Sequence, residues 1–209
     1  MANQLSPSRM EAFSDGVIAV IITIMVLEIH IPAHNVSDLA GLRALAPILF
    51  VYLLSFVQVG IYWVNHHYLI DDLKHVSHGI LWCNLAVLFL LSLFPAATAW
   101  VGERGFTSFS ICLYSVVSFL PGIPWFLLTL IACKHFRIQT ANSAAKLYTS
   151  MSSYLAAILL AWVSPWISLA LLIFVASLWL TPPRSIVEKT RALMKQSREE
   201  NSPEWPQKP

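Results

Sequence analysis

The hydrophobic residues of this chain fall into long runs that are separated by short polar segments. A helix needs about 20 consecutive apolar residues to cross a bilayer, and most of the runs approach that length. The pattern predicts six transmembrane helices, over approximately residues 9–31, 42–67, 77–101, 106–133, 143–163 and 165–181. We therefore expect an all-α integral membrane protein, with a six-helix transmembrane domain over 1–181 and a polar tail over 182–209.

Prolines mark the places where the predicted helices bend or end. Pro95 lies inside the third helix, where a transmembrane bundle tolerates a kink. Pro121 and Pro124 interrupt the fourth helix, which either kinks there or divides into two elements. Ser164–Pro165 divides the last apolar stretch into two spans; if Pro165 only kinks this stretch, the chain has five spans.

The distribution of basic residues favours six spans over five. With six spans, eleven of the thirteen lysines and arginines lie on one side of the membrane, and only Arg43 and Arg104 lie on the other. This asymmetry satisfies the positive-inside rule with both termini in the cytoplasm, whereas five spans would export the basic tail. We expect a multi-pass protein of the cell membrane.

Composition agrees with a membrane protein. Hydrophobic residues make up 57% of the 209 residues and charged residues 11%, and the mean hydropathy is +0.66. A soluble domain carries about 25% charged residues. The net charge of +2 does not indicate nucleic acid, because the basic residues lie at helix ends and in the tail.

Motifs for enzymatic chemistry are missing. The sequence has no GxSxG, HExxH, Walker or dinucleotide-binding pattern, so we expect neither an enzyme nor a resident cofactor. Cys83, Cys112 and Cys133 show no CxxC spacing and are interpreted as small buried hydrophobes.

Four histidines gather near one predicted membrane face, at positions 66, 67, 75 and 78. Histidines at i, i+4 on one helix would favour a metal or haem site, and no pair within a single predicted helix has that spacing. We interpret the group as a polar cap and expect no metal.

The first helix is unusually short for one that faces lipid. Its uncharged centre, Gly16 to Leu27, has twelve residues and is bounded by Asp15 and Glu28. Carboxylates at membrane depth usually face the interior of a bundle or a water-filled path. We therefore expect this helix to lie inside the assembled protein.

One face of the first helix carries a regular stripe. At about 100° per residue, Val20, Thr23, Ile24 and Leu27 share one side of the helix. Asp15 lies roughly 140° from Val20 and points toward neighbouring helices. One amphipathic helix cannot enclose an ion path, but several copies around a rotation axis would stack the stripe into collars, and apolar collars gate by dewetting.

The start of this helix resembles a known family. Arg9, Phe13, Ser14 and Asp15 form an RxxxFSD pattern, followed by a β-branched and Leu-rich run. This pattern is similar to the signature of the transmembrane protein 175 family of potassium channels. The chain has the length of one six-helix repeat, as in the prokaryotic members.

The resemblance implies a homotetramer with the first helix at its centre, in which apolar side chains act as filter and gate. By position after the motif, the corresponding residues are Val20, Ile24 and Leu27, with Thr23 beside them. Val20 stands where isoleucine or leucine is expected, which bears on pore width and potassium selectivity.

The resemblance also implies that the signature is a structural clamp for the pore helix. Arg9 and Asp15 are six residues apart and therefore reach separate partners. Candidate partners are the polar residues at the end of the second helix, namely Trp63, Asn65, His66 and His67. Direct ion coordination by Asp15 is the second interpretation.

These observations predict a passive channel for potassium and other monovalent cations, with no cofactor other than the permeant ion. A proton-coupled secondary transporter is the alternative, with Asp15, Glu28 and the histidines of the second helix as proton-binding groups. A structural membrane protein without transport is the third class.

Overall fold

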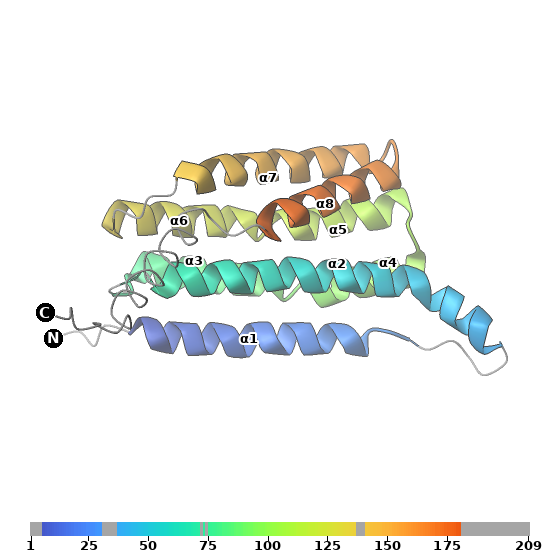
Figure 1. Ribbon diagram of the computed structural model, residues 1–209, viewed down its shortest axis with the longest axis horizontal. Helices are drawn as coiled ribbons and strands as arrows, with labels where there is room; N and C mark the ends of the chain where they lie inside the picture. The colour runs from blue at the N-terminus through green and yellow to red at the C-terminus, as the bar shows by residue number, and fades with distance from the viewer. Residues whose placement is uncertain (1–5, 31–36, 72, 74, 137–140, 181–209) are drawn as a thin grey trace, which may run out of the picture.

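The computed structural model of this chain is a bundle of antiparallel helices (Figure 1). It describes residues 6–30, 37–71, 73, 75–136 and 141–180, and every regular element within these ranges is helical. The helices are α1 Pro7–Leu27, α2 Asp38–Asp71, α3 His78–Leu91, α4 Phe94–Arg104, α5 Ser108–Phe119, α6 Gly122–Phe136, α7 Ala141–Leu160 and α8 Pro165–Leu180.

The helices form three layers. In Figure 1, α1 lies below the rest of the bundle, α2 lies in the middle with α3 and α4, and α5 to α8 lie above. The helix α1 packs on α2, α3 and α4, while α7 packs on α5 and α8. The first helix therefore lies at the edge of the described bundle, with one side covered and one side open.

Local sequence accounts for the ends of α1. Pro7 occupies the first turn, where its missing N–H would have no partner in any case, and Ser6 is the N-cap. The helix ends at Leu27, and the backbone N–H of Glu28 still donates to the carbonyl of Val26. The sequence predicted a helix over 9–31; residues 31–36 lie outside the described part of the chain.

Two of the predicted spans are each built from two helices. The span expected over 77–101 is divided into α3 and α4, because Pro95 cannot donate a backbone hydrogen bond and its ring clashes with the preceding turn. The span expected over 106–133 is divided into α5 and α6 around Pro121. The sequence left open whether the Pro121–Pro124 region kinks one helix or separates two. In the structure this region separates α5 from α6.

The last apolar stretch is an antiparallel pair of helices. Residues 161–164 form the turn between α7 and α8, and the two helices pack against each other. By length and hydropathy, the described residues contain four stretches able to cross a membrane: Pro7–Leu27, Asp38–Asp71, His78–Arg104 and Ser108–Ala132. Pro165–Leu180 is a shorter apolar helix.

Hydroxyl groups join the layers inside the core. The Ser55 hydroxyl of α2 lies 2.7 Å from that of Thr98 in α4 and 2.8 Å from that of Tyr114 in α5. Ser115 of α5 bonds to Ser168 of α8 at 3.0 Å. In a membrane protein such interhelical hydrogen bonds hold helices in register, because hydrocarbon offers polar groups no partner.

Close packing of α4 on α2 gives a first prediction. A Cβ atom at Gly102 would collide with the Ile48 side chain, whereas one at Gly41 meets nothing within 4 Å. We expect Gly102→Ala to lower the free energy of unfolding by about 1 kcal/mol, through overpacking. Gly41→Ala should raise it by about 0.5–1 kcal/mol, through lower entropy of the unfolded chain. Thermal unfolding in detergent measures both, and shifts of equal sign would contradict this packing.

Candidate pore helix and its polar anchor

The helix α1 has a covered face and an open face. The residues of the covered face are less than 5% exposed and follow helical spacing: Met10, Ser14, Ile18, Ile21 and Met25. This face contacts α2, α3 and α4. The remaining residues of the helix therefore face outward from the subunit or along its flanks.

Two polar contacts join the beginning of α1 to the end of α2. The indole N–H of Trp63 donates to the Asp15 carboxylate at 2.9 Å, and Nδ1 of His67 lies 2.7 Å from the Glu11 carboxylate. Since a carboxylate only accepts, Nδ1 carries the proton. The helices run antiparallel, so positions 11 and 15 of α1 face positions 67 and 63 of α2, one turn apart on each helix.

A third contact joins α1 to α3 and lies entirely in the core. His66 donates from Nε2 to the Asn84 side-chain carbonyl at 2.7 Å, and the Asn84 amide donates to the Ser14 hydroxyl at 2.9 Å. Ser14 in turn donates to the backbone carbonyl of Met10 at 2.8 Å. In this series of hydrogen bonds, His66 donates to Asn84, Asn84 to Ser14 and Ser14 to Met10. The donors therefore all point the same way, from α2 through α3 to α1. We call these contacts the polar anchor. It consists of the pairs Trp63–Asp15 and His67–Glu11 and the series His66–Asn84–Ser14.

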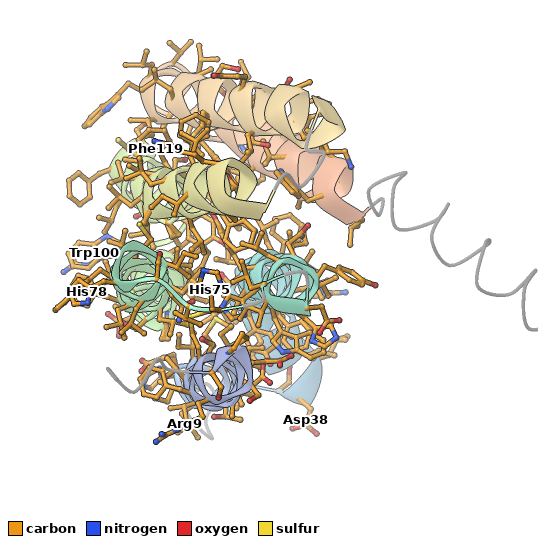
Figure 2. The ribbon with its side chains drawn as sticks, turned by 90° about the vertical axis from the view of Figure 1, so that its left-hand side faces the viewer. Arg9, Asp38, His75, His78, Trp100 and Phe119 are labelled. Atoms are coloured by element: carbon orange, nitrogen blue, oxygen red, sulfur yellow. The ribbon has the colours of Figure 1, made fainter. Side chains whose placement is uncertain are left out.

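The other predicted residues of this region lie outside the polar anchor. Arg9 is exposed on the side of α1 that faces away from the bundle (Figure 2). Phe13 is also exposed. Asn65 donates to the carbonyl of Ile61 within its own helix, at 2.7 Å, and does not reach α1.

The predicted stripe lies on the open face of α1. Val20 is 54% exposed, Ile24 41% and Leu27 75%, and Thr23 between them is exposed as well. The Thr23 hydroxyl donates to the carbonyl of Val20 at 2.9 Å, which leaves little polarity on this side. Among the residues that the structure describes, none covers most of this apolar surface.

Grooves run along both flanks of α1. One groove, of about 690 Å³, lies between Phe13, Val20 and Ile24 of α1 and the Pro95 and Ala96 side of α4. The other, of about 740 Å³, lies between α1 and α2. Residues that line the second groove include Asp15, Ile22, Val57, Gly60 and Trp63. Both grooves are walled mostly by apolar side chains.

The histidines do not form one common site. His67 bonds to Glu11, His66 bonds to Asn84, and His78 accepts from the Trp82 indole at 2.8 Å. In the described residues, one group of metal-ligating side chains lies close enough to share an ion, namely Glu11, His67 and Asp71. The two carboxylates approach different ring nitrogens of His67, at 2.7 and 3.8 Å, so the imidazole lies between Glu11 and Asp71.

Comparison with known proteins identifies the family. The sequence model named "Endosomal/lysosomal potassium channel TMEM175" matches residues 9–95, the segment that contains most of α1, the polar anchor and the break before α4. A protein of a Chryseobacterium strain, named a potassium channel, is 38% identical over 187 residues, which cover 87% of this chain and 96% of that protein. This chain belongs to the TMEM175 family of channels.

A solved TMEM175 structure resembles this chain over most of its length, whereas the sequence match to the human relative covers less than half of the chain. A crystal structure from Chamaesiphon minutus, titled a lysosomal potassium-selective channel TMEM175 homolog, superposes with a TM-score of 0.76. It is 27% identical and covers 83% of this chain and 96% of its own. The human relative, named a proton channel, is 32% identical over 105 residues, which are 44% of this chain and 20% of that protein.

The family assignment confirms the resemblance carried by the RxxxFSD pattern. The TMEM175 family and the relatives are channels, not enzymes, and the family transports monovalent cations. The chain is therefore a membrane protein of several apolar helices, in a family of potassium channels.

Two residues of the polar anchor are not among those predicted from the sequence. Asn84 lies in the apolar centre of the third predicted helix, and Glu11 lies inside the signature without being part of it. An asparagine within an apolar run is itself a signal, because a buried amide requires partners. The sequence does not say which helix supplies those partners.

Proposed function

We propose that this protein is a potassium channel that conducts K⁺ and other monovalent cations passively through the centre of a homotetramer. In this assembly α1 of each subunit lies at the axis. Val20, Thr23, Ile24 and Leu27 line the pore. The protein needs no resident cofactor, and the potassium ion is its permeant substrate.

The open face of α1 is the observation that carries this proposal. A helix whose uncharged centre has twelve residues is a poor match for a hydrocarbon core about 30 Å thick, yet its stripe is exposed in the single subunit. Grooves on both flanks of α1 supply the two different surfaces that a head-to-tail ring requires. A second copy of the chain, packed against α1, would cover the exposed stripe and fill the grooves.

The proposed filter and gate are apolar. Collars of Val20, Ile24 and Leu27 exclude water when they are narrow and admit hydrated ions after a small widening. The polar anchor holds the beginning of α1 against α2 and α3. In the described part of the chain, residues 20–27 form no side-chain hydrogen bond to another helix. Asp15 is bonded to Trp63, so we assign it to the anchor and not to the ion path.

The proposed topology has six spans in one channel domain over residues 1–181, with a tail over 182–209. The pairs α3 with α4 and α5 with α6 each cross as one span, and α7 and α8 cross singly. With the eleven-to-two distribution of basic residues, both termini lie in the cytoplasm and the protein lies in the cell membrane.

A flux assay tests the channel proposal. Purified protein in liposomes should pass K⁺ down its gradient without any difference in pH across the membrane, and Na⁺ measured in parallel gives the selectivity. Absence of flux for every monovalent cation would contradict a channel and favour the structural class.

Proton-coupled transport is the second candidate, and the vertebrate relatives named proton channels are the observation that favours testing it. Asp15, Glu28 and the histidines of α2 would then take up and release protons. Coupled transport would appear in the same liposomes as K⁺ flux that a pH gradient drives and that protons accompany. K⁺ flux that moves no protons across the membrane excludes this candidate.

The anchor predicts that Asp15 acts on assembly. Asp15→Asn keeps an acceptor for Trp63 but removes the charge, so we expect a weaker anchor and a smaller fraction of tetramer in detergent, measured by light scattering after size exclusion. The expected loss is about 1 kcal/mol per subunit, the difference between a charge-assisted and a neutral hydrogen bond. Normal assembly together with altered ion preference would instead place Asp15 in the ion path.

A further inference from the structure

A small cavity lies inside the subunit, away from the candidate pore. Its volume is about 30 Å³, and its walls come from α2, α6, α7 and α8, with no residue of α1. Among the lining side chains, those with polar groups are Gln58, Tyr62, Asn65, Trp125, Tyr154 and Trp179. The cavity thus combines a small volume with several groups that can form hydrogen bonds.

Gln58 is the key residue of this cavity. Its side chain is 2% exposed, and neither its amide nitrogen nor its carbonyl oxygen has a hydrogen-bond partner in the described part of the protein. An unpaired buried amide is costly, because it loses its hydrogen bonds with water and gains none. Asn84, the buried amide of the polar anchor, uses both its oxygen and its nitrogen in hydrogen bonds. Gln58 therefore requires partners that the described part of the protein does not supply.

The size of the cavity selects the class of ligand. One water molecule needs about 10–15 Å³ of such volume, whereas a cavity that holds benzene measures about 150 Å³. A volume of about 30 Å³ therefore fits about two waters and excludes aromatic or sugar ligands. A buried water also needs two to four polar partners, which Gln58, Tyr62 and Tyr154 can provide.

We propose that this cavity is a binding site for about two ordered water molecules, which satisfy the Gln58 amide and bridge it to Tyr154. Gln58 belongs to α2 and Tyr154 to α7, and α7 packs chiefly on α5 and α8. The bound waters supply a polar link between α2, which anchors α1, and the α7–α8 pair. This proposal does not depend on ion conduction.

The test combines a high-resolution structure with radical footprinting of the full-length protein in lipid nanodiscs. Density for water within hydrogen-bond distance of both amide atoms of Gln58 is the expected structural result. In X-ray footprinting, bound water makes hydroxyl radicals beside buried side chains, so Tyr154 should be oxidised although it is buried. Tyr114 is the control: it is also buried, at 1% exposed against 6% for Tyr154, and its hydroxyl bonds to Ser55, so it should stay unmodified.

The variant Gln58→Leu removes the amide and leaves the cavity apolar. We expect loss of the water density and a fall of Tyr154 oxidation to the level of Tyr114, with K⁺ flux unchanged. If this variant does not fold, the wild-type protein still decides the question. A dry cavity in wild type, or Tyr154 that is no more oxidised than Tyr114, would overturn the proposal. A Gln58 amide rotated onto a protein partner would also overturn it.

Discussion

Leu27→Asn is expected to increase potassium flux through this protein by about tenfold or more. Leu27 lies at the end of the stripe and is its most exposed member at 75%. In the proposed pore its side chains form an apolar collar that repels water, and an amide in that place makes the collar wettable. A decrease of only about 1.4 kcal/mol in the barrier gives a tenfold change in rate, and the polarity difference between leucine and asparagine exceeds that. Liposome flux assays measure the change.

Leu159→Asn is the matched control for this prediction. Leu159 lies on α7, far from α1 in the sequence, and is 65% exposed. The Leu159→Asn variant places the same amide at an exposed position that the proposal assigns to the lipid-facing surface, so K⁺ flux should not change. As an independent readout, Ile24→Cys should let a water-soluble thiol reagent block flux. If Leu27→Asn and Ile24→Cys both behave like wild type, the stripe does not line a pore.

Asn84→Leu is expected to destabilise the protein more than any other single change to the polar anchor. Asn84 is completely buried and bonds to both His66 and Ser14. Leucine has a similar size but leaves the His66 N–H without an acceptor in the core, at a cost of about 1–3 kcal/mol. A loss of about 2 kcal/mol lowers the melting temperature by roughly 4–8 °C for a chain of this length. Differential scanning fluorimetry in detergent measures the shift.

Asn65→Leu serves as the control for Asn84→Leu. Within the described residues the Asn65 amide bonds to a carbonyl of its own helix and to no other helix, so its replacement should change the melting temperature by much less. We also expect Asn84→Leu to reduce K⁺ flux, because a poorly anchored α1 cannot hold the collars in line. Equal shifts for the two variants would show that the anchor contributes no special stability.

The pairing of α1 with α2 illustrates where sequence-based prediction succeeded and where it stopped. The polar end of the second helix was predicted to supply partners for the signature, and the structure places Trp63 beside Asp15. Asn65 was predicted as a partner too, yet it lies about 200° around the helix from Trp63 at 100° per residue. Two residues so placed cannot both face α1, and the choice between them depends on how α2 is rotated in the bundle.

The prolines also show what the sequence could predict and what it could not. A break near Pro95 and another near Pro121 followed from the chemistry of proline, which removes a donor and crowds the preceding turn. At Pro95 the sequence predicted a kink within one helix, whereas for Pro121–Pro124 it left a kink and two separate helices open. In the structure, α3 ends at Leu91 and α4 begins at Phe94, so the first break is a separation. That outcome depends on the helices packed around the break, which supply space and hydrogen-bond partners for a turn at membrane depth.

By itself the sequence determined that this protein is helical and lies in a membrane, and that Val20, Ile24 and Leu27 share a face. These properties follow from hydropathy and helical periodicity, which act over a few neighbouring residues. Only the tertiary structure decided that this face is open, that Asn84 joins Ser14 to His66, and that Gln58 borders a cavity. Those facts arise from contacts between residues far apart in the chain, such as the 70 positions that separate Ser14 from Asn84. Their geometry depends on how whole helices pack, and no local pattern encodes it.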